Sequence, residues 1–74
     1  MEIFVLEYFY ERGGRRVTRI FSDPETALEA LEFGCKLEPV NSGSIKRYEN
    51  RIDNEFLVTS NCYRVEFGKI IKCK

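Results

Sequence analysis

Residues 2–21, EIFVLEYFYERGGRRVTRIF, carry the strongest structural signal in the chain, because two apolar stretches flank a pair of glycines. Residues 2–10 are aromatic and β-branched, which is typical of a strand with both faces at least partly covered. Gly13-Gly14 lies between charged residues and indicates a two-residue hairpin turn, whose central positions require positive φ. Residues 15–21, RRVTRIF, are then the returning strand of this hairpin.

The register of this hairpin sorts its side chains onto two faces. With Gly13-Gly14 central in the turn, Tyr10 pairs with Val17 and Tyr8 with Arg19. Because side chains alternate along a strand, the first face, which we expect to be core, collects Phe4, Leu6, Tyr8, Tyr10, Val17 and Phe21, with Arg19 as the odd member. The second face collects Ile3, Val5, Phe9 and Ile20, diluted by Glu7, Arg16 and Thr18.

A short helix follows the hairpin. Ser22 and Glu25 fit a capping box, and Pro24 is tolerated in the first helical turn. We expect the helix to run to about Phe33 and Gly34 to end it in the left-handed conformation. Leu28 and Leu31, flanked by Ala27 and Cys35, form the expected buried stripe. Three glutamates form an acidic stripe on the opposite side, Glu25, Glu29 and Glu32.

The second half of the chain indicates three more strands. Residues 38–44 are a loop by composition, and residues 45–51, 55–60 and 62–72 are the expected strands, with turns at Asp53-Asn54 and Ser60-Asn61. Gly68 is expected to mark a bulge. A turn at Ser60-Asn61 would put Phe56 and Val58 on one face with Tyr63 and Val65, and Phe67 continues this face. Residues 45–51 are expected at a sheet edge with their register open, because Ile45 and Tyr48 point to opposite sides. These elements predict a single α+β domain over residues 1–74, an antiparallel sheet of about five strands with one helix packed on one face, in the order ββαβββ.

The composition excludes several kinds of chemistry. The 74 residues include 12 Lys and Arg, 12 Asp and Glu, and no histidine. Without histidine there is no Ser-His or Cys-His nucleophile pair and no histidine metal site, and no phosphate-binding loop motif is present. We therefore expect no catalysis, no metal and no cofactor. The balanced charge is not that of a basic protein selected for nucleic acid.

The cysteines bear on the cellular compartment. Cys35, Cys62 and Cys73 are odd in number and show no C-x-x-C spacing, which argues against a disulfide framework or a zinc site. We expect them to be small hydrophobes in a reducing compartment, and their redox role stays open. No charged segment leads into a long apolar stretch, so neither a signal peptide nor a membrane span is expected. A cytoplasmic location follows, in the host cytoplasm if the chain is phage-encoded.

The charged segments suggest three binding interpretations. Arg12, Arg15, Arg16 and Arg19 of the hairpin could contact phosphates or a protein, or could keep an exposed turn soluble; Arg15 and Arg16 project to opposite faces, which disfavours a single phosphate surface. The glutamate stripe is either only the solvent-exposed side of a helix or a surface complementary in charge to a basic groove of a partner, such as the one in which a nuclease holds nucleic acid. The second face, Ile3, Val5, Phe9 and Ile20, is either a site of self-association or partner docking, or is covered by the C-terminal strands as a partial barrel.

The small size, the lack of a catalytic motif, and the order of a hairpin, a short acidic helix and three more strands resemble the small phage-encoded anti-CRISPR proteins. The resemblance covers the whole chain as an architectural pattern, matches no motif of any one such family, and carries over no functional residue. It implies a protein that acts stoichiometrically by covering surfaces of host defence complexes.

We therefore expect a non-enzymatic protein that occludes a protein or nucleoprotein partner, with a bacterial CRISPR or other defence nuclease complex as the leading target. The alternatives are a small nucleic-acid-binding regulator that uses the arginine-rich hairpin, and a structural subunit that dimerises through the second face.

Overall fold

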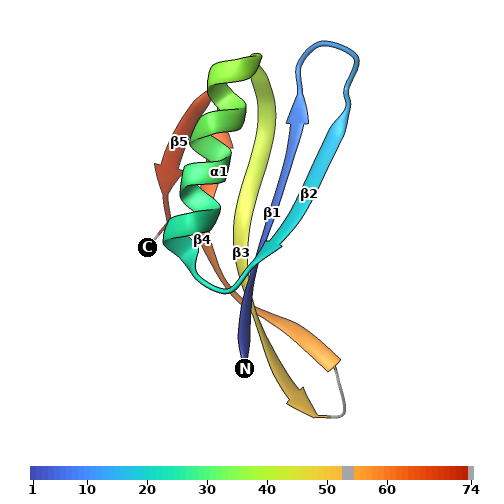
Figure 1. The fold of residues 1–74 in the computed structure, drawn as a ribbon, viewed down its shortest axis with the longest axis vertical. Coiled ribbons are helices and arrows are strands. Elements are labelled where there is room, and N and C mark those ends of the chain that lie inside the picture. Colours follow the sequence, from blue (N-terminus) through green and yellow to red (C-terminus); the bar gives the residue numbers. More distant parts are fainter. Residues whose placement is uncertain (53–54, 74) are drawn as a thin grey trace.

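The computed structural model describes residues 1–52 and 55–73, so the expected turn at Asp53-Asn54 lies outside the described residues. The elements are β1 (Glu2–Tyr10), β2 (Arg16–Phe21), α1 (Pro24–Leu37), β3 (Val40–Ile52), β4 (Glu55–Glu66) and β5 (Lys69–Lys72). The strands form one antiparallel sheet in the order β2-β1-β3-β4-β5, and α1 packs on one face of it (Figure 1). The predicted α+β fold and the order ββαβββ are confirmed.

The core lies between α1 and the sheet and is centred on β1. The even-numbered side chains of β1 point toward the helix, and they are buried together with residues of α1, β3 and β4: Phe4, Leu6, Tyr8, Tyr10, Ala27, Leu31, Val40, Ile45 and Val65. Val17 and Phe21 of β2 pack partly buried against this cluster. The first face of the hairpin is therefore the core face, as predicted.

The register of the first hairpin differs from the prediction by two residues. Tyr8 pairs with Val17 and Leu6 with Arg19, because the connection is a four-residue loop, residues 11–14, closed by a 3.0 Å hydrogen bond from Tyr10 N to Arg15 O. Both loop glycines have positive φ, as a tight reversal requires. A shift of two residues preserves side-chain alternation, so the predicted faces hold although the predicted pairs were wrong.

Both predicted helix ends were wrong. Asp23, not Ser22, is the N-cap, and its carboxylate accepts a 2.8 Å hydrogen bond from the Thr26 backbone N–H. The helix continues through Gly34 to Leu37. Gly34 is required for packing, because a Cβ at this position would lie 2.5 Å from the Tyr8 Oη. Close packing of the helix on the sheet therefore accounts for this glycine.

β3 is a central strand, so the edge position predicted for residues 45–51 was wrong. The loop predicted for residues 38–44 is confirmed only at residues 38–39, because β3 begins at Val40. β3 pairs with β1 from Glu2↔Glu49 to Tyr10↔Val40 and with β4 on its other side. Gly43 lets the strands approach closely, since a Cβ there would lie 2.7 Å from the Tyr8 Cβ. The edges of the sheet are β2 and β5.

β4 is continuous through Ser60-Asn61, where a turn was predicted, and its pairing with β3 is irregular on both sides of that point. Phe56 and Val58 consequently share no face with Tyr63 and Val65: Val58 lies opposite Tyr48, whereas Tyr63 lies opposite the buried Ile45. The last reversal is at Phe67-Gly68, both with positive φ, so Gly68 belongs to a turn and not to a bulge.

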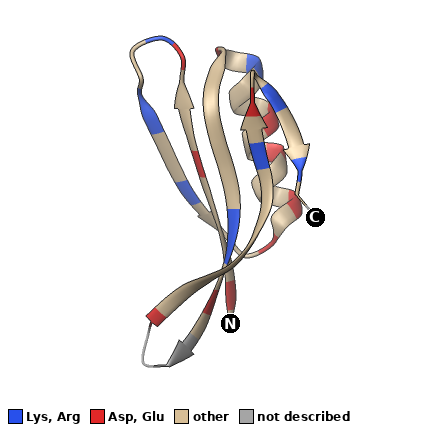
Figure 2. Cartoon of the chain, turned by 180° about the vertical axis from the view of Figure 1, so that it is seen from behind, with Lys and Arg blue, Asp and Glu red and all other residues tan. Residues whose placement is uncertain are grey.

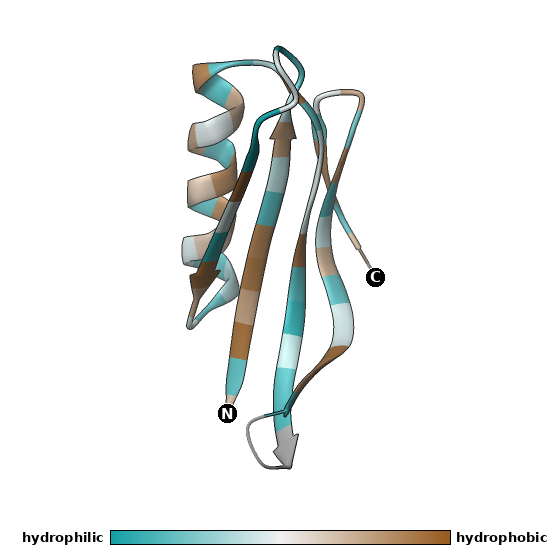
Figure 3. Cartoon of the chain, turned by 90° about the vertical axis from the view of Figure 1, so that its right-hand side faces the viewer, coloured by the Kyte–Doolittle hydropathy of each residue, from teal (hydrophilic) through white to brown (hydrophobic). Residues whose placement is uncertain are grey.

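The sheet face turned away from α1 has no layer packed on it within residues 1–52 and 55–73 (Figures 2 and 3). We call it the open sheet face, and its apolar side chains among the described residues are Ile3, Val5, Phe9, Ile20, Tyr48, Phe56, Val58 and Ile71. β4 and β5 extend the sheet and do not curl over this face, so the partial barrel considered for the sequence is not formed.

Candidate partner-binding surface

Three connections meet at one end of the molecule: the β1–β2 loop, the α1–β3 connection and the β4–β5 turn (Figure 1). The Glu11 backbone N–H donates a 2.9 Å hydrogen bond to the Pro39 carbonyl, which joins the first connection to the second. We call this surface the loop end and define it by its exposed side chains, Arg12, Arg15, Leu37, Pro39 and Phe67. Because it gathers segments from three parts of the chain, no single stretch of sequence reveals it.

The four arginines of the hairpin do not form one cluster. Arg15 Nη2 lies 3.2 Å from the Glu38 carboxylate, and its guanidinium carbon lies 4.7 Å from the centroid of the Tyr10 ring. Arg16 lies on the open sheet face, where its Nη1 is 3.8 Å from Glu7. Arg12 is exposed in the loop. The prediction that Arg15 and Arg16 project to opposite faces is therefore confirmed, and only Arg12 and Arg15 belong to the loop end.

Arg19 is the charged member of the core-facing set, and the structure shows how it avoids burial. It is exposed at the edge strand β2, and its guanidinium carbon lies 4.9 Å from the centroid of the Phe21 ring. Stacking over an aromatic ring lets the charge remain in water while its stem covers apolar surface. Arg19 is separate from the loop end, since it lies near the other end of β2.

Among the side chains whose exposure the structure describes, Phe67 is the most exposed large apolar one, with 98% of its area accessible. Its φ is 53°, in the left-handed region, where a bulky L-residue is strained. The sequence suggested that Phe67 would continue the strand face of Tyr63 and Val65, because strand alternation was extended through a residue that belongs to the turn. The Phe-Gly pair between two β-branched stretches was the available signal, and it is weak because Phe is uncommon at such a position.

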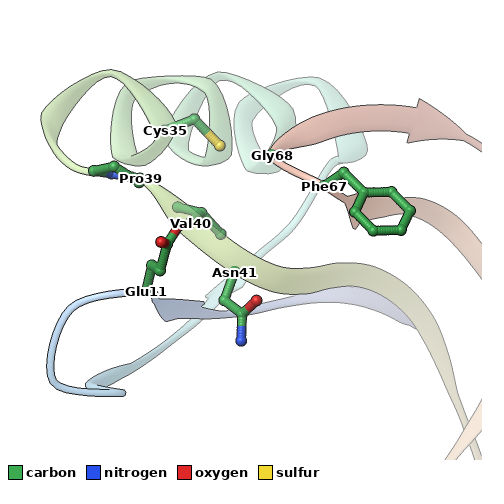
Figure 4. Close-up of a pocket in the computed structure, with 7 residues that line it drawn as sticks. All are labelled: Glu11, Cys35, Pro39, Val40, Asn41, Phe67 and Gly68. Carbon is green, nitrogen blue, oxygen red and sulfur yellow. The ribbon is translucent and has the colours of Figure 1, made fainter.

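A shallow depression separates Phe67 from the other two connections (Figure 4). Its lining residues are Glu11, Cys35, Pro39, Val40, Asn41, Phe67 and Gly68. Burial, and then the nearby Glu32 carboxylate, raise the pKa of the Cys35 thiol, which keeps this group protonated near neutral pH. A second depression shares Glu11 and Pro39 and adds Arg12 and Leu37. The loop end is thus a mixed surface of apolar and arginine side chains around two shallow hollows.

The glutamate stripe lies on a different part of the molecule. Glu25, Glu29 and Glu32 are exposed on α1. The structure therefore separates the predicted binding residues onto the helix, the loop end, the open sheet face and, for Arg19, the β2 edge. It places Ile3, Val5, Phe9 and Ile20 together on the open sheet face. Leu37 and Phe67 were missed, Leu37 because the helix is longer than expected.

The buried pair Tyr8 and Tyr10 beneath the helix predicts that the fold loses stability at alkaline pH. Burial raises the pKa of Tyr8 to about 12, and the hydrogen bond with Tyr10, with Oη atoms 3.4 Å apart, adds to the effect. In the unfolded chain the pKa of a tyrosine is about 10, so the unfolded state loses its proton first as pH rises. We expect the contribution of Tyr8 to the free energy of unfolding to be fully present below about pH 10 and to be lost as the pH rises from 10 to 12.

Chemical denaturation at a series of alkaline pH values measures this dependence. A Tyr8→Phe variant is the control, because it cannot titrate at this position and should show a shallower decline. An equal slope for the variant and the wild type would show that Tyr8 is not responsible.

Within residues 1–52 and 55–73, no group of three or more acidic or cysteine side chains is arranged to hold a metal ion. The same residues contain no helix that is both long and apolar enough to cross a bilayer. Cys35, Cys62 and Cys73 are free thiols. Comparisons with protein-family models, curated proteins and solved structures find no match to this chain.

Proposed function

We propose that this chain is a non-enzymatic binding protein that covers a surface of a macromolecular partner and uses its loop end for the contact. The observation that carries the proposal is Phe67, which is strained and exposed at the same time. A left-handed φ in a bulky residue costs about 1 kcal/mol, and an exposed ring recovers nothing from burial. Contact with a partner would give this ring the burial that the isolated fold does not.

The neighbours of Phe67 support the same function. Arginine and aromatic side chains are enriched among the residues that dominate binding energy at protein interfaces. Arg15 is held in place by Glu38 and by the Tyr10 ring, so little conformational entropy is lost when a partner contacts it. Leu37 is 59% exposed and extends the apolar area beyond Phe67. A protein surface that is apolar at its centre and carries acceptors at its rim fits this arrangement.

The proposed partner is a protein or nucleoprotein component of a bacterial CRISPR or other defence nuclease complex. The support for this class is the architectural resemblance to phage-encoded anti-CRISPR proteins, together with a binding surface built from short connections on a small domain. Recognition of nucleic acid through the hairpin is less well supported, because Arg15 and Arg16 lie on opposite sides of the sheet and cannot contact one phosphate surface together.

Replacing Phe67 with asparagine is expected to separate binding from stability. Asparagine tolerates the left-handed region, so the variant should be more stable by about 1 kcal/mol, with a melting temperature about 4 °C higher. Loss of the ring should weaken partner binding by about 30-fold or more, the effect of removing an interface hot spot. Thermal unfolding measures the first quantity, and titration of nuclease cleavage by the purified protein measures the second.

The matched control is Leu57→Asn, which removes another exposed apolar side chain, 47% accessible, from β4. It should bind the partner as the wild type does. Partners for the titration are first identified by parallel capture from host lysate with wild type and Phe67→Asn. Equal inhibition by Phe67→Asn and wild type would remove the loop end from the proposal, and salt-sensitive binding to DNA or RNA would favour the nucleic-acid regulator.

A further inference from the structure

We propose that two copies of this chain stack their open sheet faces about a two-fold axis parallel to β3, which forms a sandwich of two sheets with the helices outside. This inference concerns a surface separate from the loop end and does not rest on the proposed function. It commits the open sheet face to one occupant, a second copy, and to one orientation.

The first argument is the apolar content of the face. Ile3, Tyr48 and Val58 occupy one row across β1, β3 and β4, since Ile3 pairs with Tyr48 and Tyr48 with Val58. In the adjacent row Val5 pairs with Ile20 of β2. Ile20 is 65% exposed and Val58 is 52% exposed. Contiguous apolar side chains on an exposed sheet face mark an interface in soluble proteins.

The second argument is size. The Cα trace extends over 39 × 24 × 17 Å, and the two longer dimensions are those of the sheet seen face-on (Figure 2). An outline of this size can supply the roughly 800 Å² per partner that a standard stable interface buries. The short dimension holds only one helix layer and one sheet layer, so a second sheet about 10 Å away would complete a sandwich.

The third argument is that the face is complementary to itself. Glu7 on β1 and Arg64 on β4 lie in one row on either side of Ser44 on β3, because Glu7 pairs with Ser44 and Ser44 with Arg64. A two-fold rotation about an axis along β3 brings β1 of one copy over β4 of the other. Glu7 then faces the second copy's Arg64, and each such contact occurs twice.

The same rotation matches the apolar row. Ile3 of one copy faces Val58 of the other, and Tyr48 lies near its own symmetry mate on the axis. The ion pairs that Glu7 and Arg64 already make within the chain, with Arg16 and Glu66, are exposed and contribute little, so they do not compete strongly with contacts across the interface. In this arrangement each acidic Glu7 therefore faces a basic Arg64, and each apolar Ile3 faces an apolar Val58, of the other copy.

Lys46 is the residue that this arrangement disfavours. It lies on β3 between the rows of Ser44 and Tyr48, so it faces its own symmetry mate near the axis. Two ammonium groups held close together repel each other. We expect Lys46→Met to tighten the dimer by about tenfold, a change that corresponds to the loss of one unfavourable charge contact.

Sedimentation equilibrium of the full chain tests the proposal. The wild type is expected to reach twice the 8.7 kDa mass of one chain as concentration rises. Val58→Lys should raise the dissociation constant by about 100-fold, because it places a charge against the partner's Ile3. Leu57→Lys is the control: the neighbouring residue of the same strand points to the other side of the sheet, opposite Glu49, and should leave the mass unchanged.

A charge exchange tests the orientation. Glu7→Arg and Arg64→Glu should each weaken the dimer by about tenfold, and the double variant should restore it, because the ion pair reforms with its signs reversed. Circular dichroism of each variant verifies that the fold is retained. A wild type that stays at the mass of one chain at every concentration overturns the dimer, and failure of the double variant to recover overturns the two-fold axis along β3.

Discussion

Replacing Gly34 with leucine is expected to lower the free energy of unfolding by about 3 kcal/mol or more. Tyr8 lies between two glycines: a Cβ at Gly34 would be 2.5 Å from its Oη, and a Cβ at Gly43 would be 2.7 Å from its Cβ. The ring cannot move away, because it is buried under α1 and packs edge-to-face on Tyr10 at a centroid distance of 5.3 Å. For a domain of 74 residues, with a total stability of about 4–11 kcal/mol, this loss removes a large share.

The direction of this effect is opposite to that of helix propensity. Leucine in place of a mid-helix glycine would stabilise an isolated helix by about 0.8 kcal/mol, so only the contact with Tyr8 can produce a large loss. Glu29→Leu adds the same side chain to the exposed side of α1 and is the control. Urea denaturation measures both variants, and partial recovery when Gly34→Leu is combined with Tyr8→Phe would identify the tyrosine as the opposing group. A Gly34→Leu variant as stable as the wild type would show that the helix can shift without cost.

Replacing Ile45 with alanine is expected to lower the free energy of unfolding by about 3–4 kcal/mol. Ile45 is one of the largest fully buried side chains, with no accessible area, and lies on the central strand β3 between Leu6 of β1 and Tyr63 of β4. The truncation leaves a cavity that close-packed neighbours on both sides cannot fill. The loss should appear as a lower urea midpoint with an unchanged slope.

The comparison variant for Ile45 is Leu57→Ala, because Leu57 is 47% exposed and its truncation should cost less than about 0.5 kcal/mol. An Ile45→Ala loss below about 1 kcal/mol would be the result for an edge strand, the position that the sequence suggested, and would contradict the central placement of β3.

The first hairpin shows what a sequence can predict despite an error. The predicted pairs were two residues out of register, yet Phe4, Leu6, Tyr8 and Tyr10 were correctly assigned to the core, because side-chain alternation has a period of two. The alternation of apolar residues therefore predicted which side chains share a strand face more reliably than it predicted which residues pair across the hairpin.

Other features were beyond local patterns because tertiary contacts control them. Gly34 was expected to end the helix, yet it lies within α1. Glycine is needed there because the ring of Tyr8, far away in the sequence, occupies the space that a side chain at residue 34 would fill. β3 was expected at an edge, since nothing in residues 45–51 indicates that β1 and β4 pair with it on both sides. Packing between distant segments overrode the local signals in both cases.

The candidate site was predicted in part. Of the arginines singled out in the sequence, Arg12 and Arg15 lie together at the loop end, whereas Arg16 lies across the sheet from them. Phe67 was assigned to a strand face with Tyr63 and Val65, because its turn conformation depends on where β4 ends, and the sequence alone does not show that this strand ends at Glu66. An exposed, strained aromatic residue can be recognised only once backbone angles are known.

The position of β1 between β2 and β3 determines how the chain must assemble. Three of the four strand pairings in the described sheet join consecutive strands, and only β1–β3 crosses the segment that contains β2 and α1. The N-terminal hairpin and the C-terminal meander can each form from contacts that are near in sequence, whereas β1–β3 pairing must close a long loop and is therefore slower. Tyr8 and Gly43 meet at this late junction, so the time that the chain takes to fold depends on how quickly its two halves find that register.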